Sequence, residues 1–594
     1  MQSLAANEVR LLDGLFKERE TVNRNYLMEL DNRALLQNFY AEAGIVLPEL
    51  QIVEDPAASY LHWGWEAPTC QLRGHFLGHF LSAASKLAAS NNDRELEAKV
   101  YVIIDELKKC QDLNGGKWIG SIPEKFFHKL ERGEYIWSPQ YTVHKTLMGL
   151  LDVYVNTGYK LALEIIDSLS DWYVQWVDSL TDTPWVVVKG EAGGMLEIWA
   201  RLYKLTGEAK YLSLAKSYSI YSNFTTLEQG GDALTNNHAN ASIPEAHGAA
   251  MMYEATGDEK WLNITKLFWK CAIIDRESYV TGGQNAGEFW ITPGHFYEAM
   301  GDRNQEFCTM YNMVRLADYL LRFTGDSKYS DYIERALYNA FASQQNKITG
   351  MPTYFLPLRA GSRKKWGTKR HDFWCCHGTM VQAQTLYPSL CYYKNDIENT
   401  VWIQQYIPSK ACFTINNKTV QISQTTDMSY SAGVLFDDNN NDTKSRWIIK
   451  INVTSQDEIT LKFRVPEWTQ NTIYVDGKKV EVFDGYYSIT KVFDNEDISI
   501  FFPSSLHTQG LSDNNNIVAI MDGPIALAAT GKDSTNFSLD NKDVNTALTP
   551  FVEHTYDTYP WSQNMYTTTD NSGQILFKPI YDITDESYTV YVAK

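Results

Sequence analysis

The sequence predicts an α+β multidomain protein in which an N-terminal (α/α)6 toroid over residues 1–395 is followed by C-terminal β-sandwich domains. Two observations predict this architecture. A helix–turn–helix phrase returns at intervals of about 50 residues in the first part, and the apolar pattern changes to a period of two after about residue 396. We expect a β-sandwich over residues 396–508, and a second β-sandwich or a closing β-region over residues 509–594.

The N-terminal part shows helical spacing from its beginning. The first amphipathic pattern has apolar residues at Leu12, Leu15, Phe16, Val22, Tyr26, Leu27 and Leu30. A phrase built around Thr-Gly then returns at 203–212, 253–262 and 322–329, with a fainter copy at 155–159. Each copy has a glycine that is typical of a helix end; these are Gly158, Gly207, Gly257 and Gly325.

The spacing of these glycines favours a closed ring. Successive glycines are 49, 50 and 68 residues apart. Six hairpins of this length need about 300 residues plus loops, which fits the space before residue 395, and an open solenoid is the alternative. The long step carries about 18 extra residues, including Thr281–Asn285. Insertions on one rim of a repeat fold are where function tends to lie.

The C-terminal part shows strand signals instead. Ile459, Leu461, Phe463 and Val465 alternate with polar residues. Asp476-Gly477 and Asp484-Gly485 are Asp-Gly pairs, which are typical of two-residue hairpin turns, and residues 437–442 are expected to form a polar loop. Further strands are predicted within 517–529 and 588–592.

Composition and charge exclude several classes of function. The chain has 594 residues, 44% apolar composition and a net charge of −19, with no basic stripe that could bind nucleic acid. It has no run of 18 apolar residues and no apolar segment at its start, so neither a transmembrane helix nor a signal peptide is expected. Seven sequons permit a secreted or lumenal location, and a cytoplasmic one is the alternative. Eight cysteines are too sparse for a disulfide framework.

Two pairs of residues suggest a metal site. Cys375 and Cys376 are adjacent, so their mutual disulfide would be strained, although both can bind one metal from a bent loop. Glu306 and Cys308 are two residues apart where a helix is predicted to start, and there they can converge. One glutamate and three cysteines make the four ligands of a closed zinc site. The alternatives are unrelated buried thiols, or His371 and His377 as ligands.

Other residues are candidates for catalysis and substrate binding. Glu288 follows Gly287 in the inserted rim loop, where a carboxylate can act as a general acid or can simply be solvated. Histidines at four positions are expected to line the central cavity of the toroid, or to be satisfied core residues. They are His75, His79, His144 and His247.

Taken together, these motifs resemble glycoside hydrolase family 127 and its neighbour family 146, the β-L-arabinofuranosidases. The resemblance runs over most of the chain and is carried by the segments 9–14, 72–79, 281–283, 306–312, 373–379 and 517–524. The order of a Gly-rich loop with Glu288, then Glu306-x-Cys308, then Cys375-Cys376 is its most specific part.

The resemblance implies a retaining glycoside hydrolase that releases β-L-arabinofuranose from arabinose-containing glycans. It implies that Glu306, Cys308, Cys375 and Cys376 bind Zn2+, that Cys375 is the nucleophile and that Glu288 is the acid/base. It also implies sugar contacts for His144 and His247, and we add His75, His79 and Tyr311 as candidates. The expected partner is a carbohydrate, with no nucleic acid and no membrane, and the oligomeric state stays open. The alternatives are a glycan-binding toroid with a structural zinc, and a polysaccharide lyase or another toroid hydrolase.

Overall fold

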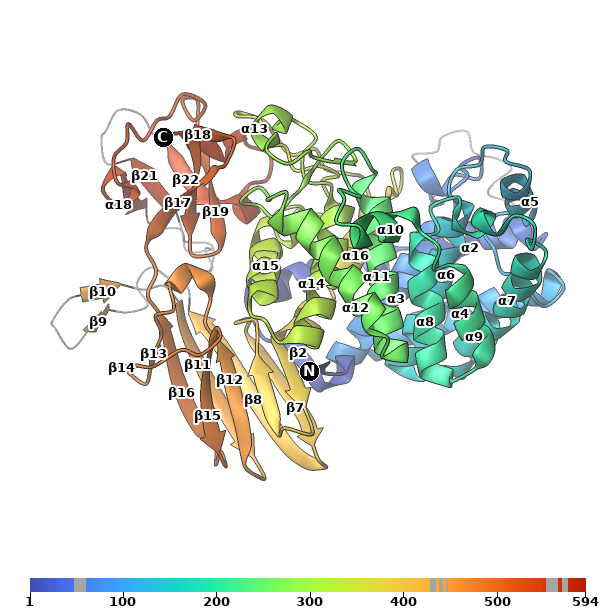
Figure 1. The fold of residues 1–594 in the computed structure, drawn as a ribbon, viewed down its shortest axis with the longest axis horizontal. Coiled ribbons are helices and arrows are strands. Elements are labelled where there is room, and N and C mark those ends of the chain that lie inside the picture. The colour runs from blue at the N-terminus through green and yellow to red at the C-terminus, as the bar shows by residue number, and fades with distance from the viewer. Residues whose placement is uncertain (48–59, 428–433, 437–441, 445–446, 552–564, 569–574) are drawn as a thin grey trace.

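The structure is a computed structural model, and it places a helical body beside a β-rich body (Figure 1). It describes residues 1–47, 60–427, 434–436, 442–444, 447–551, 565–568 and 575–594. The helices occupy the first two thirds of the chain, and nearly all strands follow Cys391. The predicted order of a helical part and then β domains is therefore confirmed. Most of the predicted polar loop, residues 437–441, lies outside the described residues.

Six helices form an inner ring. They are α3 (His75–Asn91), α6 (Pro139–Thr157), α8 (Gly193–Thr206), α11 (Ala239–Thr256), α14 (Phe307–Thr324) and α16 (Cys375–Ala383). Each of these helices contacts the next one in this order, and α16 contacts α3, so the ring is closed. Glycines allow the close approach of neighbours: a Cβ at Gly78 of α3 would lie 1.9 Å from the Lys145 carbonyl oxygen of α6.

A second layer of helices packs outside this ring. Each outer helix contacts the inner helix that precedes it; they are α4 (Arg94–Leu113), α7 (Lys160–Asp178), α9 (Ala209–Ser217), α12 (Glu259–Trp269) and α15 (Lys328–Ala336). Near the start of the chain, α1 (Leu15–Glu29) contacts α3, and α2 (Asn32–Glu42) contacts α3 and α4.

The repeated glycines end the inner helices, as predicted. Gly158, Gly207, Gly257 and Gly325 are the C-caps of α6, α8, α11 and α14, with left-handed φ values between 72° and 74°. A residue with a Cβ pays a steric cost in this conformation, which glycine avoids. Each glycine therefore turns the chain from an inner helix to an outer one.

The next part of the chain builds two sheets. One has the strand order β1-β5-β6-β12-β15, and the other has the order β14-β13-β16-β11-β8-β7-β2. The short strands among them are β1 (Gln2–Ser3), β2 (Val9–Leu11), β13 (Tyr474–Val475) and β14 (Lys478–Lys479). Their strands include β5 (Tyr392–Asn395), β6 (Thr400–Ile403), β7 (Ser409–Ile415), β8 (Lys418–Asp427), β11 (Trp447–Ser455), β12 (Ile459–Arg464), β15 (Tyr486–Lys491) and β16 (Glu496–Phe502). The predicted Asp476-Gly477 turn joins β13 (Tyr474–Val475) to β14 (Lys478–Lys479), and both turn residues have positive φ.

Two short strands at the chain start correct the expectation that the first 395 residues are all helix. β1 (Gln2–Ser3) pairs with β5, and β2 (Val9–Leu11) pairs with β7. Val9 and Leu11 face inward while Arg10 is exposed, which is the alternation of a half-buried strand. Two and three residues are too few for a period to be visible in the sequence.

The C-terminal residues form an eight-stranded sheet that lies against the loops of the helical body (Figure 1). It contains β17 (Leu506–Leu511), β18 (Asn514–Asp522), β19 (Ile525–Thr530), β20 (Leu548–Phe551), β21 (Met565–Thr568), β22 (Leu576–Pro579), β23 (Tyr588–Thr589) and β24 (Tyr591–Ala593). Its apolar residues share one core cluster with Tyr279, Val280, Ile291 and Leu356 from the inserted rim segments. In the described part of the chain, no helix combines the length and apolar character that crossing a bilayer requires.

Candidate active site

Four ligand-type side chains converge at one point of the helical body. The carboxylate of Glu306 and the sulfurs of Cys308, Cys375 and Cys376 all lie within 4.8 Å of one another, and all four residues are buried. Cys376 Sγ lies 3.4 Å from Cys308 Sγ and 4.0 Å from Cys375 Sγ, and Cys375 Sγ lies 3.6 Å from Glu306 Oε1. We call these four residues the Glu–Cys cluster.

The starts of two inner helices position the Glu–Cys cluster. Glu306 is the N-cap of α14, and Cys308 is in its first turn, so residues two apart converge there as the sequence suggested. Cys375 and Cys376 are the first two residues of α16. The positive end of the helix dipole and the free N–H groups of a first turn favour anions, thiolates included. Phe373 has a φ of 47°, and this left-handed residue turns the chain sharply into α16.

The cluster has the properties of a cation site. Burial raises the pKa of Glu306, Cys308 and Cys376 well above the usual ranges, because it removes water from the ionised forms. The negative charges of neighbouring acids in the cluster add to this effect. In the described part of the chain, Glu306 Oε2 is buried and has no hydrogen-bond partner. Three thiolates and a carboxylate in this space need a positive charge among them, so the residues present fit a dication with soft ligands.

Cys375 differs from the other two thiols. The neighbouring thiol of Cys308, and then those of Cys376 and the Tyr354 hydroxyl, lower the pKa of Cys375 well below the usual range. Cys375 is 6% exposed, whereas Cys308 and Cys376 are fully buried. Cys375 therefore differs from the other two sulfurs in its slight exposure and in neighbours that favour its ionised form.

A tyrosine joins Cys375 to Glu288. The Tyr354 hydroxyl donates a hydrogen bond to Glu288 Oε1 at 2.7 Å, and it lies 3.5 Å from Cys375 Sγ. Glu288 lies at the turn of the rim hairpin formed by β3 (Asn285–Ala286) and β4 (Phe289–Trp290), beside Gly287, whose φ is 60°. The Glu288 carbonyl accepts a hydrogen bond from the Ala239 amide at 2.8 Å, which fixes the turn against the start of α11.

Sequence reasoning missed three residues of this region. Tyr354 carries no motif, and its position follows only from the fold. His238 Nε2 lies 3.8 Å from Glu288 Oε2, while its Nδ1 caps α11. Glu191 lines the cavity beside Cys308 and Thr379 and has a left-handed φ of 55°. A glycine-rich stretch around Glu191, with Gly190, Gly193 and Gly194, is the one sequence signal that marked this loop.

The cavity beside the cluster is lined by the N-terminal halves of inner helices. His144 and Lys145 of α6, Gly193 and Gly194 of α8, Asn240 of α11 and Asn312 of α14 contribute to its wall. His144 is 6% exposed. A Cβ at Gly194 would lie 2.5 Å from the His144 ring, so this glycine leaves the space in which the imidazole sits.

The other predicted histidines are fully buried and bound to protein groups. The ring nitrogens of His75 contact the Phe373 carbonyl at 2.8 Å and the Tyr141 hydroxyl at 3.4 Å. His79 contacts Gln382 Oε1 at 2.5 Å and the same tyrosine hydroxyl at 3.5 Å. His75 thereby supports the residue that turns the chain into Cys375.

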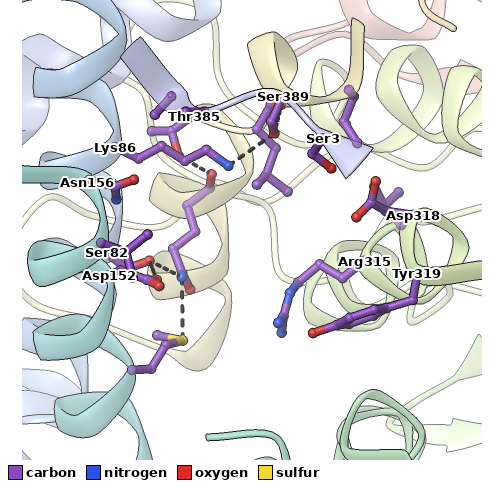
Figure 2. Close-up of a pocket in the computed structure, with 18 of the residues that line it drawn as sticks. Ser3, Ser82, Lys86, Asp152, Asn156, Arg315, Asp318, Tyr319, Thr385 and Ser389 are labelled. Atoms are coloured by element: carbon purple, nitrogen blue, oxygen red, sulfur yellow. Dashed lines mark hydrogen bonds between the residues drawn. The ribbon is translucent and has the colours of Figure 1, made fainter. Parts of the chain in front are cut away.

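The remaining two candidates lie on different helices, His247 on α11 and Tyr311 in the second turn of α14. His247 contacts the Asn312 carbonyl at 2.8 Å and Arg315 Nη1 at 3.3 Å. Tyr311 lines a second cavity, whose wall also includes Arg315, Asp318 and Tyr319 (Figure 2). The structure therefore groups His144 with the cavity beside the cluster and places Tyr311 in another one.

Comparisons with known families agree with this geometry. A family model described as the β-L-arabinofuranosidase GH127 catalytic domain matches residues 8–389, and the GH127 middle-domain model matches residues 400–503. The helical body with its buried Glu–Cys cluster is thus the catalytic domain of a glycoside hydrolase. The chain belongs to glycoside hydrolase family 127, the β-L-arabinofuranosidase family.

Solved structures share the fold over the whole chain. A GH127 β-L-arabinofuranosidase from Geobacillus stearothermophilus T6 is 18% identical, with a TM-score of 0.73 over 98% of this chain and 99% of that one. Another GH127 β-arabinofuranosidase is 18% identical, with a TM-score of 0.72 over 100% and 97%. A structure described only as a glycoside hydrolase is 14% identical, with a TM-score of 0.69 over 100% and 97%. No curated protein sequence matches the chain.

Proposed function

We propose that this chain is a retaining β-L-arabinofuranosidase in which Cys375 is the nucleophile and Glu288 the acid/base. The observation that carries the proposal is the contact of both residues with the single hydroxyl oxygen of Tyr354. A retaining glycosidase places its two catalytic groups roughly 5 Å apart, and two groups on either side of one oxygen have this kind of spacing. The sugar specificity comes from the family and from the structures that the chain resembles.

We propose Zn2+ as the ion of the Glu–Cys cluster. Glu306, Cys308, Cys375 and Cys376 would hold it, since thiolates and a carboxylate are a zinc donor set. When bound, zinc keeps the thiols ionised near neutral pH, where a free cysteine with a pKa of about 8.5 is mostly protonated.

The reaction of the chain's own residues then has two steps. The Cys375 sulfur attacks the anomeric carbon while the bond to the leaving oxygen breaks, and Glu288 gives its proton to that oxygen. In the second step Glu288 takes a proton from water, the water oxygen bonds to the anomeric carbon, and the carbon–sulfur bond breaks. The free sugar leaves with the configuration of the substrate, and both residues return to their first states.

Surrounding residues hold these groups in place. Tyr354 donates to Glu288 and orients it toward the sulfur, and His238 approaches the other carboxylate oxygen. We propose that His144 contacts the sugar, because it lines the cavity beside the cluster. His75, His79 and His247 have ring nitrogens bound to protein groups, so we propose that they position the cavity wall.

The main alternative is a structural zinc in a protein that only binds glycans. The position of Glu288 supports the enzyme instead. A structural zinc site needs no exposed carboxylate beside it, whereas the Glu288 side chain is 34% exposed and hydrogen-bonded through Tyr354 toward Cys375. The same arrangement gives no support to a lyase, which needs no nucleophile.

Trapping the covalent intermediate tests the proposal. Incubation with a slow p-nitrophenyl β-L-arabinofuranoside analogue should give one pentosyl adduct, and peptide mass spectrometry should assign it to Cys375. Cys375→Ser and Glu288→Gln should each lower turnover at least about a hundredfold, while Cys412→Ser, at an exposed cysteine on β7, should have no effect. A Cys375→Ser enzyme that binds zinc and hydrolyses substrate at the parent rate would favour the structural-zinc alternative.

A further inference from the structure

The helical ring contains a second cavity that the proposed reaction does not use. It has a volume of about 330 Å3 and is lined by α3, α6, α8 and α14 from their second turns onward, together with Gln382 of α16 and the segment that follows this helix. The Glu–Cys cluster instead lies at helix N-termini. The N-terminal segment, residues 3–6, covers part of this cavity. Its volume lies at the small end of the range for ligand sites, which is about 300–1,000 Å3.

A buried ion pair separates this cavity from the active site. Glu197 and Arg315 line both cavities, and the two side chains form a short ion pair. Tyr319 also donates to Glu197 at 2.8 Å. Because these groups satisfy one another, they form a shared wall, and the second cavity is a site of its own.

The other charged residues of the cavity are almost all paired. Asp152 forms an ion pair with Arg201 at 2.7 Å, and it also accepts from Ser82. Asp318 forms an ion pair with Arg322 at 3.2 Å and accepts a hydrogen bond from the Tyr393 hydroxyl. Arg322 also contacts Glu254 at 3.1 Å, but Lys204 pairs with that glutamate at 2.6 Å, so each carboxylate of the cavity wall is still matched by a cation.

Lys86 is the exception. Its Nζ donates to Ser389 Oγ at 3.1 Å, and among the residues that the structure describes it forms no ion pair with a carboxylate. Burial lowers the pKa of Lys86 to about 8, and the charges of Asp152 and Asp318 only partly oppose this effect. Figure 2 shows the Lys86 amine on one wall of the cavity, with Arg315, Asp318 and Tyr319 on the facing wall.

We propose that this cavity binds a monosaccharide-sized carboxylate, that is a sugar acid, whose single negative charge pairs with Lys86. Three wall arginines balance three wall carboxylates, so Lys86 is one positive charge in excess, and one carboxylate matches it. Ser82, Asn156 and Thr385 line the same space; their donors bind protein groups, and their oxygens can accept hydrogen bonds from a ligand with several hydroxyl groups. A charge-assisted hydrogen bond in a partly desolvated cavity is about twice as strong as a neutral one, which makes Lys86 the anchor.

Calorimetric titration of the full chain with sodium glucuronate tests this site. We expect saturable binding of one glucuronate per chain at low salt, and no binding of glucose, its neutral counterpart. Lys86→Met keeps the length of the side chain and removes its charge, and it should weaken glucuronate binding at least tenfold. Lys266→Met, at an exposed lysine on α12, is the matched control and should bind as the parent does.

A second measurement needs no variant, so it decides the question even if Lys86→Met fails to fold. Acetylation by acetic anhydride at pH 8, followed by peptide mass spectrometry, should modify Lys86 less when glucuronate is saturating, and Lys266 equally with and without it. Unchanged acetylation of Lys86, or equal affinity of Lys86→Met and the parent, would overturn the proposal. Binding of inorganic phosphate without binding of glucuronate would also overturn it, because the cavity would then take a small anion and no sugar acid.

Discussion

Replacing Tyr354 with phenylalanine tests the geometry of the candidate active site at one atom. The substitution removes the hydroxyl that donates to Glu288 and contacts Cys375, and it leaves the ring. The ring packs against Phe355 and Trp374, with centroids 4.6 Å and 5.6 Å away, so these contacts should hold the side chain in place. The expected effect is thus on catalysis and only slightly on folding.

The size of the effect follows from the hydrogen bond that is lost. A hydrogen bond to a charged group contributes about 1.5–3 kcal/mol, which corresponds to roughly a 10- to 150-fold change in rate. Tyr354 acts on two reacting groups at once, so we expect kcat/KM on p-nitrophenyl β-L-arabinofuranoside to fall by about two orders of magnitude. KM should change little, because the hydroxyl orients Glu288 and the sulfur and contacts the sugar only indirectly.

Tyr135→Phe is the matched control, because Tyr135 is 84% exposed and its hydroxyl has no role in this site. This variant should keep the parent rate. Zinc content, measured by elemental analysis, should be the same in Tyr354→Phe as in the parent. A Tyr354→Phe enzyme with parental kcat/KM would refute the reasoning, since Glu288 and Cys375 would then work without the group that joins them.

Three further predictions concern stability and the metal. Chelation should abolish activity and lower the melting temperature, because four buried acidic groups then lie together without a cation. Added zinc should restore both, and a chelated protein with the parental melting temperature would contradict this prediction. Arg464→Met should destabilise the protein by about 3–5 kcal/mol in urea unfolding, because Asp331 and Glu334 lose the buried guanidinium that lies 2.6 Å from each of them; an unchanged midpoint would speak against it. Burial raises the pKa of Glu245 from 4.5 to about 8, so its carboxyl holds a proton more tightly in the folded state, and its contribution to stability is lost as the pH rises through about 8. Glu245→Gln should therefore melt above the parent at pH 9 and close to it at pH 5, and the same difference at both pH values would show that charge is not the cause.

Much of the helical architecture could be predicted because local physics repeats along the chain. The glycines at 158, 207, 257 and 325 were predictable as helix ends, because a helix often ends at a left-handed residue and glycine adopts this conformation at the lowest cost. All four have a left-handed φ in the structure. The convergence of Glu306 and Cys308 was also readable, because a helix start allows residues two apart to share one side.

The rest depends on contacts between segments that are distant in sequence. Tyr354 is 66 residues from Glu288 and 21 from Cys375, and no local pattern links these three residues. The first strands of the chain are similar: β2 pairs with β7 some 400 residues later, and its register is set by the partner. His79 is a further example. Its hydrogen bond with Gln382, which is 303 residues away, determines its role, and no sequence pattern links the two residues.

The position along the inner helices accounts for the difference between the two sites. Anion-forming groups lie at the starts of α14 and α16, where the helix dipoles are positive and first-turn N–H groups are free. The second cavity begins farther along the helices, and its arginines Arg201, Arg315 and Arg322 pair with carboxylates of the same wall. The helix dipole acts only within the first or last turn, so it has little effect on Lys86, which lies more than a turn before the end of α3. The Glu–Cys cluster therefore depends on two helix starts, whereas the charge of the second cavity depends on which side chains pair with one another.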